Sequence, residues 1–186
     1  MLSLWLQLGF EHILDINGYD HILYLVTLCA IYNIKEWKKV LLLATAFTIG
    51  HSLTLALNVM GLVKISPNLI ETLIPVTIIL TALYNLAIDS KPETDTKIGY
   101  MLAVGFGLIH GLGISNFLKT MMSPGDSLVM SLLGFNIGVE LAQIVVVIIS
   151  LLVSYLVLSL LKIGRSTWIK IVSLASIAIS TYILIS

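Results

Sequence analysis

The sequence has few charged side chains. Its 186 residues include ten acidic and ten basic side chains, 11% of the chain, and their net charge is zero. An average soluble domain carries about 25% charged residues. Neither a basic patch nor a run of like charges is present, so the sequence excludes a nucleic-acid-binding protein. Its single cysteine, Cys29, excludes an internal disulfide framework.

Apolar residues are abundant, at 58% of the chain. A chain of this length cannot bury so much apolar surface behind so few charges, so most of its surface must face lipid. The longest stretch that reads as water-exposed is residues 89–97, which is too short for a soluble domain. We therefore expect an all-α fold: a single integral membrane domain over residues 1–186, with a bundle of about six transmembrane helices and short loops.

A crossing takes about 20 apolar residues. On this basis the predicted spans are residues 10–33, 38–60, 66–88, 97–119, 127–161 and 167–185. The fifth is too long for one perpendicular crossing and must tilt, protrude or begin with a short turn. The first ten residues are expected to form an amphiphilic lead-in, with Trp5 at the membrane interface.

Basic residues are unevenly distributed among the predicted connections. Two of the ten, Lys64 and Lys119, lie on one face, and the other eight lie in or beside the first, third and fifth connections: Lys35, Lys38, Lys39, Lys91, Lys97, Lys162, Arg165 and Lys170. The positive-inside rule places these three connections in the cytoplasm and both termini outside. The distribution of basic residues does not distinguish a bacterial from an organellar membrane. We expect a bacterial inner (plasma) membrane.

Ionisable residues lie inside the predicted spans, where a carboxylate at the bilayer centre costs roughly 2.5 to 3.5 kcal/mol and needs a partner. They are Asp20, His21, His51, Glu71, His110 and Glu140. His51 and His110 each lie 13 residues beyond a basic residue at the predicted cytoplasmic face, and Asp20 lies 13 residues before Asn33. Each is therefore about 20 Å into a hydrocarbon layer about 30 Å thick. Three helices thus present an ionisable group at one level.

Helical periodicity also places polar residues on shared faces. One stripe on the predicted fifth helix consists of Asn136, Glu140 and Gln143. A second, on the second helix, consists of His51, Thr54 and Asn58. Stripes of this kind point to a bundle interior or a water-filled cavity. Glycines lie beside two of the polar residues inside the spans: Gly107 and Gly111 flank His110, and Gly134 and Gly138 flank Asn136. These small residues predict close helix contacts.

Three histidines beside carboxylates suit a divalent transition metal, because imidazole favours zinc, copper, iron and nickel. The alternative is a buried network in which histidines and acids satisfy one another by hydrogen bonds. His12 and Asp15 lie near the outer boundary, where they are either solvated interfacial residues or an entrance. Glu71 shares a helix with Pro75 and could instead bond backbone groups freed by that proline.

The polar residues occur in an ordered set of motifs. These are Gly9-Phe10-x-His12-Ile13 with Gly18-x-Asp20-His21-Ile22, Phe47-Thr48-x-x-His51-Ser52-x-Thr54-Leu55, Gly107-Leu108-x-His110-Gly111-Leu112-Gly113, and Phe135-Asn136-x-Gly138-Val139-Glu140-x-x-Gln143. From about residue 9 to 145 the chain resembles the HupE/UreJ family of membrane proteins. The resemblance implies a permease for nickel or a related metal, linked to hydrogenase and urease maturation. By motif, the implied metal-handling residues are His12, Asp20, His21, His51, His110 and Glu140.

Three functions remain open. The first is a permease for nickel, cobalt or zinc, in which ions enter past His12 and Asp15. The second is an intramembrane metal-dependent hydrolase that acts on a lipid-like substrate, with a three-histidine metal site and Glu140 or Asp20 as general base. The third is a metal-binding structural or sensory subunit. The expected partners are the lipid bilayer and a divalent transition metal ion but no nucleic acid, with a homo-oligomer or metalloenzyme-maturation partners left open.

Overall fold

The computed structural model describes residues 2–16, 18–88, 96–122, 125 and 127–185, and it shows helices and connections but no strand within these ranges. In chain order the elements are α1 (Leu2–Leu14), α2 (Asp20–Cys29), the short 3-10 helix η1 (Ile34–Glu36), α3 (Trp37–Val59), α4 (Pro67–Ala87), α5 (Thr96–Gly113), α6 (Ser115–Met121), α7 (Leu128–Leu160) and α8 (Arg165–Ile185). The all-α prediction is confirmed.

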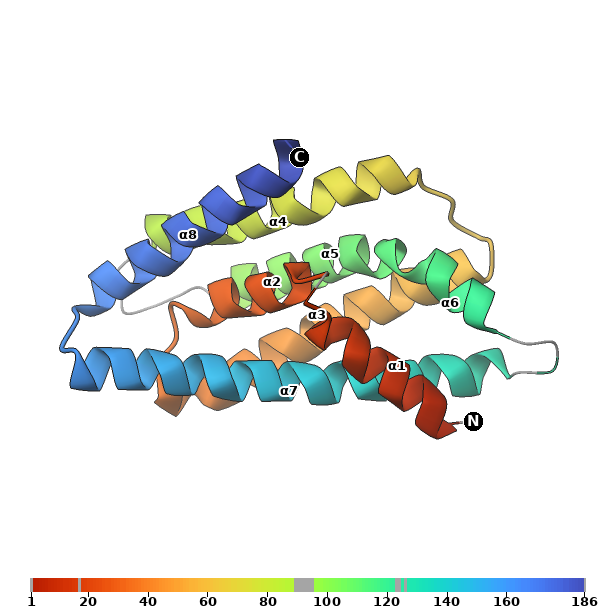
Figure 1. Ribbon diagram of the computed structural model, residues 1–186, viewed down its shortest axis with the longest axis horizontal. Coiled ribbons are helices and arrows are strands. Elements are labelled where there is room, and N and C mark those ends of the chain that lie inside the picture. The colour runs from red at the N-terminus through yellow and green to blue at the C-terminus, as the bar shows by residue number, and fades with distance from the viewer. Residues whose placement is uncertain (1, 17, 89–95, 123–124, 126, 186) are drawn as a thin grey trace.

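The helices run roughly along the long axis of the molecule (Figure 1). α2, α4 and α7 finish at the end of the bundle where α3, α5 and α8 begin. Within the bundle, α3 packs against both α5 and α7, α1 lies on α7, and α4 pairs with α8. The basic residues of the first and fifth predicted connections, together with Lys97, therefore gather at one end of the bundle; Lys91 lies outside the described residues.

Local signals set the start of two long helices. Asn33 caps the helical stretch that leads into α3: its side chain accepts a hydrogen bond from Lys35 N, and Glu36 Oε2 accepts one from Asn33 N at 3.0 Å. This reciprocal arrangement satisfies backbone donors that a helix start leaves unpaired. Pro67 occupies the first turn of α4, where its missing N–H costs nothing.

Four helical stretches among the described residues are long and apolar enough to cross a membrane. They are Ile34–Val59, Pro67–Ala87, Leu128–Leu160 and Arg165–Ile185. Asp20–Cys29 and Lys97–Gly113 are shorter apolar helices. These helices make the chain an integral membrane protein, whereas the exact number of six crossings stays a prediction. α7 has 33 residues, which makes it about 50 Å long and longer than a hydrocarbon layer of about 30 Å.

The first predicted span, residues 10–33, is not one continuous helix. It is replaced by α1 and α2, which are separate helices, so that Asp15 and Gly18 lie in the connection between them. Glycine and aspartate are poor residues for a helix interior, which accounts for a break at this point. The predicted span at 97–119 is also divided, because α5 ends at Gly113 and α6 begins at Ser115.

The first residues form a helix, and Trp5, which was expected at the membrane interface, is buried within the protein. They belong to α1, and Trp5 is only 2% exposed. α1 lies directly on α7 because glycines remove the intervening side chains: a Cβ on Gly138 would lie 2.0 Å from Leu6 O, and one on Gly9 would lie 2.0 Å from Phe135 O. The small residues predicted to allow close helix contact therefore do so, and they bring α1 into the bundle.

Candidate metal centre

Four histidines from four different helices meet inside the bundle. His12 comes from α1, His21 from α2, His51 from α3 and His110 from α5. The ring centroid of His21 lies 4.5 Å from that of His12, 5.9 Å from that of His51 and 5.2 Å from that of His110. We call these four residues the histidine cluster. A common depth was inferred from the sequence for Asp20, His51 and His110; in the structure His21, which follows Asp20, lies in one cluster with His51 and His110.

Three members of the cluster have the spacing of a metal-binding group. One ligand nitrogen from each of His12, His21 and His51 lies within 4.8 Å of the other two. His51 is 0% exposed and His21 is 4% exposed. The sequence predicted His12 near the outer boundary. In the structure His12 lies within the group, because the chain turns back toward α2 at the break after α1.

Hydrogen bonds at Nδ1 orient two of the imidazoles. His21 Nδ1 lies 3.0 Å from Asp20 Oδ1, and His110 Nδ1 lies 2.8 Å from Phe106 O. A carbonyl oxygen only accepts, so Nδ1 of His110 carries the hydrogen and Nε2 keeps its lone pair. The same assignment at His21 produces a carboxylate–histidine pair of the kind that supports metal ligands in many proteins.

Five of the six remaining ring nitrogens of the cluster are buried and have no hydrogen-bond partner among the described residues. Within the described part of the chain, no hydrogen-bond partner is found for Nε2 of His12, His21 or His110, nor for either nitrogen of His51. A buried polar group without a partner costs about 1 to 3 kcal/mol. The acid–histidine network left open by the sequence is present at Asp20 and His21 but, among the described residues, supplies no partner for these five nitrogens. The donor set matches what an imidazole-binding metal ion requires.

Glycine contacts between α3 and α5 hold two members of the cluster together. A Cβ on Gly107 would lie 2.1 Å from Phe47 O, and a Cβ on Gly111 would lie 2.1 Å from His51 O. Any other residue at these positions would push α5 away from α3. The two glycines that flank His110 in sequence thus allow α5, which carries His110, to pack directly on α3, which carries His51.

Glu140 lies on α7 and its recorded hydrogen bond is to α3 rather than to the histidine cluster. Its Oε1 accepts a hydrogen bond from Thr45 Oγ1, and nearby Gln143 Oε1 accepts one from Thr48 Oγ1 at 2.9 Å. The group of residues spaced to share a metal contains three histidines and does not include Glu140. The predicted stripe on α7 thus forms a polar contact with α3.

Glu71 also lies apart from the histidine cluster. It is exposed on α4 and lines a small pocket with Asn58, whose Oδ1 accepts a hydrogen bond from Lys119 Nζ at 2.9 Å. The stripe predicted on α3 therefore divides: His51 joins the cluster, whereas Asn58 pairs with Lys119. α4 remains helical through Pro75.

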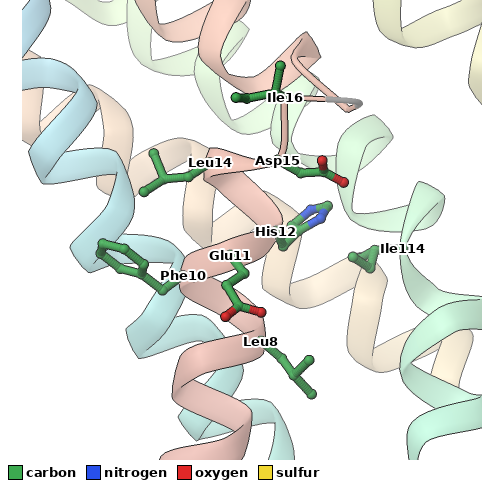
Figure 2. A pocket seen from close by; sticks show the side chains of 8 residues that line it. All are labelled: Leu8, Phe10, Glu11, His12, Leu14, Asp15, Ile16 and Ile114. Carbon is green, nitrogen blue, oxygen red and sulfur yellow. The ribbon is translucent and has the colours of Figure 1, made fainter.

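A pocket of about 740 Å³ reaches the cluster at His12. Figure 2 shows the residues that line it, mostly from α1 and the connection that follows: Leu8, Phe10, Glu11, His12, Leu14, Asp15, Ile16 and Ile114. The carboxylates of Glu11 and Asp15 flank His12 along the chain. Glu11 was not among the residues predicted from the sequence, although its position next to His12 was the available signal.

The fold and this site define a polytopic helical membrane protein with a buried, imidazole-rich centre. Over residues 1–186 the chain matches the family model described as HupE / UreJ protein. The chain therefore belongs to the HupE/UreJ family, which confirms the resemblance seen in its motifs. Comparisons with curated proteins and with solved structures returned no match.

Proposed function

We propose that this protein moves a divalent transition metal ion of the nickel, cobalt or zinc class across the membrane, with the histidine cluster as the binding site. Family membership supports metal transport in general. The observation that carries the specific proposal is the group of buried, unpaired imidazole nitrogens contributed by α1, α2, α3 and α5. Asp20 supports His21, and the ion is the transported substrate.

The pocket at His12 provides the route of entry in this proposal. It lies near α1 and Ile114, toward the end of the bundle opposite the basic connections, which is the outer end under the positive-inside rule (Figures 1 and 2). Carboxylates beside a cleft raise the local concentration of cations. Glu11 and Asp15 would attract the ion, and His12 would be its first imidazole ligand.

We propose that Glu140 binds the ion, or compensates its charge, after the ion has left the histidine cluster. Its partner Thr45 precedes His51 by six residues on α3, which places the Glu140–Thr45 contact about 9 Å to the cytoplasmic side of His51. A carboxylate inside a membrane is a functional residue by default. Glu140 then belongs to the inner half of the route rather than to the cluster itself.

The competing function is a metal-dependent hydrolase acting on a lipid-like substrate. One observation favours it: the pocket that reaches His12 is lined mainly by apolar side chains and could accept an acyl chain. Its general base would be Asp20, because Glu140 bonds to Thr45. The two functions differ in whether a metal ion crosses the bilayer, so a flux measurement separates them.

Uptake of nickel and zinc ions into proteoliposomes, reported by a trapped chelating fluorophore, tests the proposal. The wild-type protein is expected to show saturable uptake, and His51→Ala is expected to reduce it about tenfold or more because a ligand is lost. Ser173→Ala is the matched control, since Ser173 is equally buried but lies on α8. Metal retained without flux in the wild type would favour the hydrolase, and unchanged uptake by His51→Ala would refute the proposed site.

A further inference from the structure

Three aromatic side chains lie one helical turn from three of the histidines. Tyr24 follows His21 by three residues on α2, Phe47 precedes His51 by four on α3, and Phe106 precedes His110 by four on α5. α2 runs toward the end of the bundle that carries the basic connections, whereas α3 and α5 run away from it (Figure 1). The three aromatic residues therefore lie on the same, proposed cytoplasmic side of the cluster.

The three rings contact one another through Tyr24, and we call them the aromatic floor. The Tyr24 ring stacks on the Phe47 ring at 4.8 Å between centroids, and it meets the Phe106 ring edge-on at 6.3 Å. Tyr24 and Phe47 are each 1% exposed and Phe106 is 7% exposed. The buried rings thus place an apolar layer beside the cluster, and an apolar layer disfavours a hydrated ion.

Phe47 is the member of the floor that contacts the most histidines. Its ring centroid lies 5.0 Å from that of His110, 6.1 Å from that of His21 and 6.2 Å from that of His51. The His12 pocket lies on the other side along the chain from α5 to α6: its lining residue Ile114 follows His110 by four residues, whereas Phe106 precedes His110 by four. The cluster is thus reached from one side and covered by Phe47 on the other.

We propose that the aromatic floor of Tyr24, Phe47 and Phe106 is the inner gate of the metal route, with Phe47 as the side chain that must move for an ion to leave toward the cytoplasm. This inference rests on the proposed transport function. In the closed state the floor keeps the ion on the imidazoles. Release inward requires Phe47 to leave its contacts with Tyr24 and His110, so the population of the open state sets the rate of passage.

Nickel efflux from preloaded proteoliposomes tests the gate, with wild type, Phe47→Ala and Phe135→Ala compared at equal protein content. Phe135 is the matched control, because it is also fully buried and its ring lies 6.4 Å from that of His51, but it projects from α7 rather than from the floor. Phe47→Ala is expected to raise efflux about tenfold or more over wild type, whereas Phe135→Ala is not. Nickel bound per chain, measured on the purified proteins, is expected to stay the same in Phe47→Ala.

Each result decides the inference separately from the transport proposal. If nickel leaves through Phe47→Ala but not through Phe135→Ala, the result supports the gate, even where the wild-type protein shows no flux. In that case the substitution has opened a site that was sealed. Equal efflux through Phe47→Ala and Phe135→Ala overturns the gate, while saturable wild-type uptake would still support transport. Where Phe47→Ala does not fold, as judged by gel filtration, Phe106→Ala and the milder Phe47→Leu replace it and are read by the same criteria.

Discussion

Asp20 and His21 show how neighbouring residues prepare a ligand inside a membrane. Asp20 Oδ1 accepts hydrogen bonds from the backbone N–H of His21 at 2.8 Å and from the ring of the same residue at 3.0 Å. The carboxylate thereby fixes the imidazole orientation and leaves Nε2 directed at the cluster. It also supplies a negative charge that compensates a bound cation.

Replacing Asp20 by asparagine should weaken metal binding without unfolding the protein. An amide can still accept a hydrogen bond from His21 Nδ1, but it lacks the charge that raises the basicity of the imidazole. We expect the dissociation constant for nickel to rise about 10- to 100-fold, measured by isothermal titration calorimetry in detergent. Glu36→Gln, which alters a carboxylate at the distant η1, is the control, and an affinity loss as large in that variant would contradict the role of Asp20.

Individual residues differed in how well the sequence predicted their place. A common depth for Asp20, His51 and His110 could be predicted because each lies 13 residues from an expected membrane boundary, so depth follows from helical rise. The position of His12 could not be predicted, because it depends on the break between α1 and α2. Glu140 has the depth of a site residue, but its direction depends on how α7 is rotated against α3, which helical periodicity alone does not determine.

Helix contacts in this protein depend on glycines at the points of closest approach. On α5, Gly107 lies against the backbone of α3, whereas Gly105, two residues earlier, has no atom within 4 Å of the place its Cβ would occupy. These neighbouring glycines therefore have different structural roles. One allows two helices that carry the histidine cluster to touch, and the other faces open space.

Gly107→Ala and Gly105→Ala form a matched pair of variants on one helix. The first should destabilise the protein by about 1 to 3 kcal/mol or more, because its Cβ would overlap Phe47 O and force α5 away from α3. The second should be neutral or slightly stabilising, since alanine favours a helix by up to about 1 kcal/mol over glycine. Thermal unfolding in detergent measures both, and equal melting temperatures for the two variants would contradict the contact.

At the level of elements, the sequence predicted the long apolar helices well, because runs of about 20 apolar residues leave few alternatives. The predicted span 127–161 corresponds to α7, Leu128–Leu160. The prediction from the sequence failed where a helix is interrupted. Residues 10–33 form one apolar run in the sequence, yet α1 ends at Leu14 and α2 begins at Asp20. Asp15 and Gly18 are a weak local signal for this break, and the packing of α1 and α2 on α7 is tertiary and could not be predicted from the sequence.

For the whole molecule, the net charge of zero conceals a separation of charge. Basic side chains gather at the end of the bundle where α3, α5 and α8 begin, while Asp20 and the histidine cluster lie in its interior. Under the positive-inside rule that end is cytoplasmic, and this orientation stays a prediction, as do an oligomeric assembly and any maturation partner. A metal ion at the cluster would bind residues of four helices at once and so stabilise the whole bundle.

X-ray absorption spectroscopy of the purified protein loaded with nickel or zinc tests the central claim most directly, because it reports the atoms that surround the metal. The histidine cluster predicts scattering from three or four imidazole rings, with metal–nitrogen distances of about 2.0 to 2.1 Å for zinc. That signal should decrease in His51→Ala and persist in Ser173→Ala. A spectrum showing only oxygen ligands, or one unchanged in His51→Ala, would contradict the assignment of the histidine cluster as the metal site.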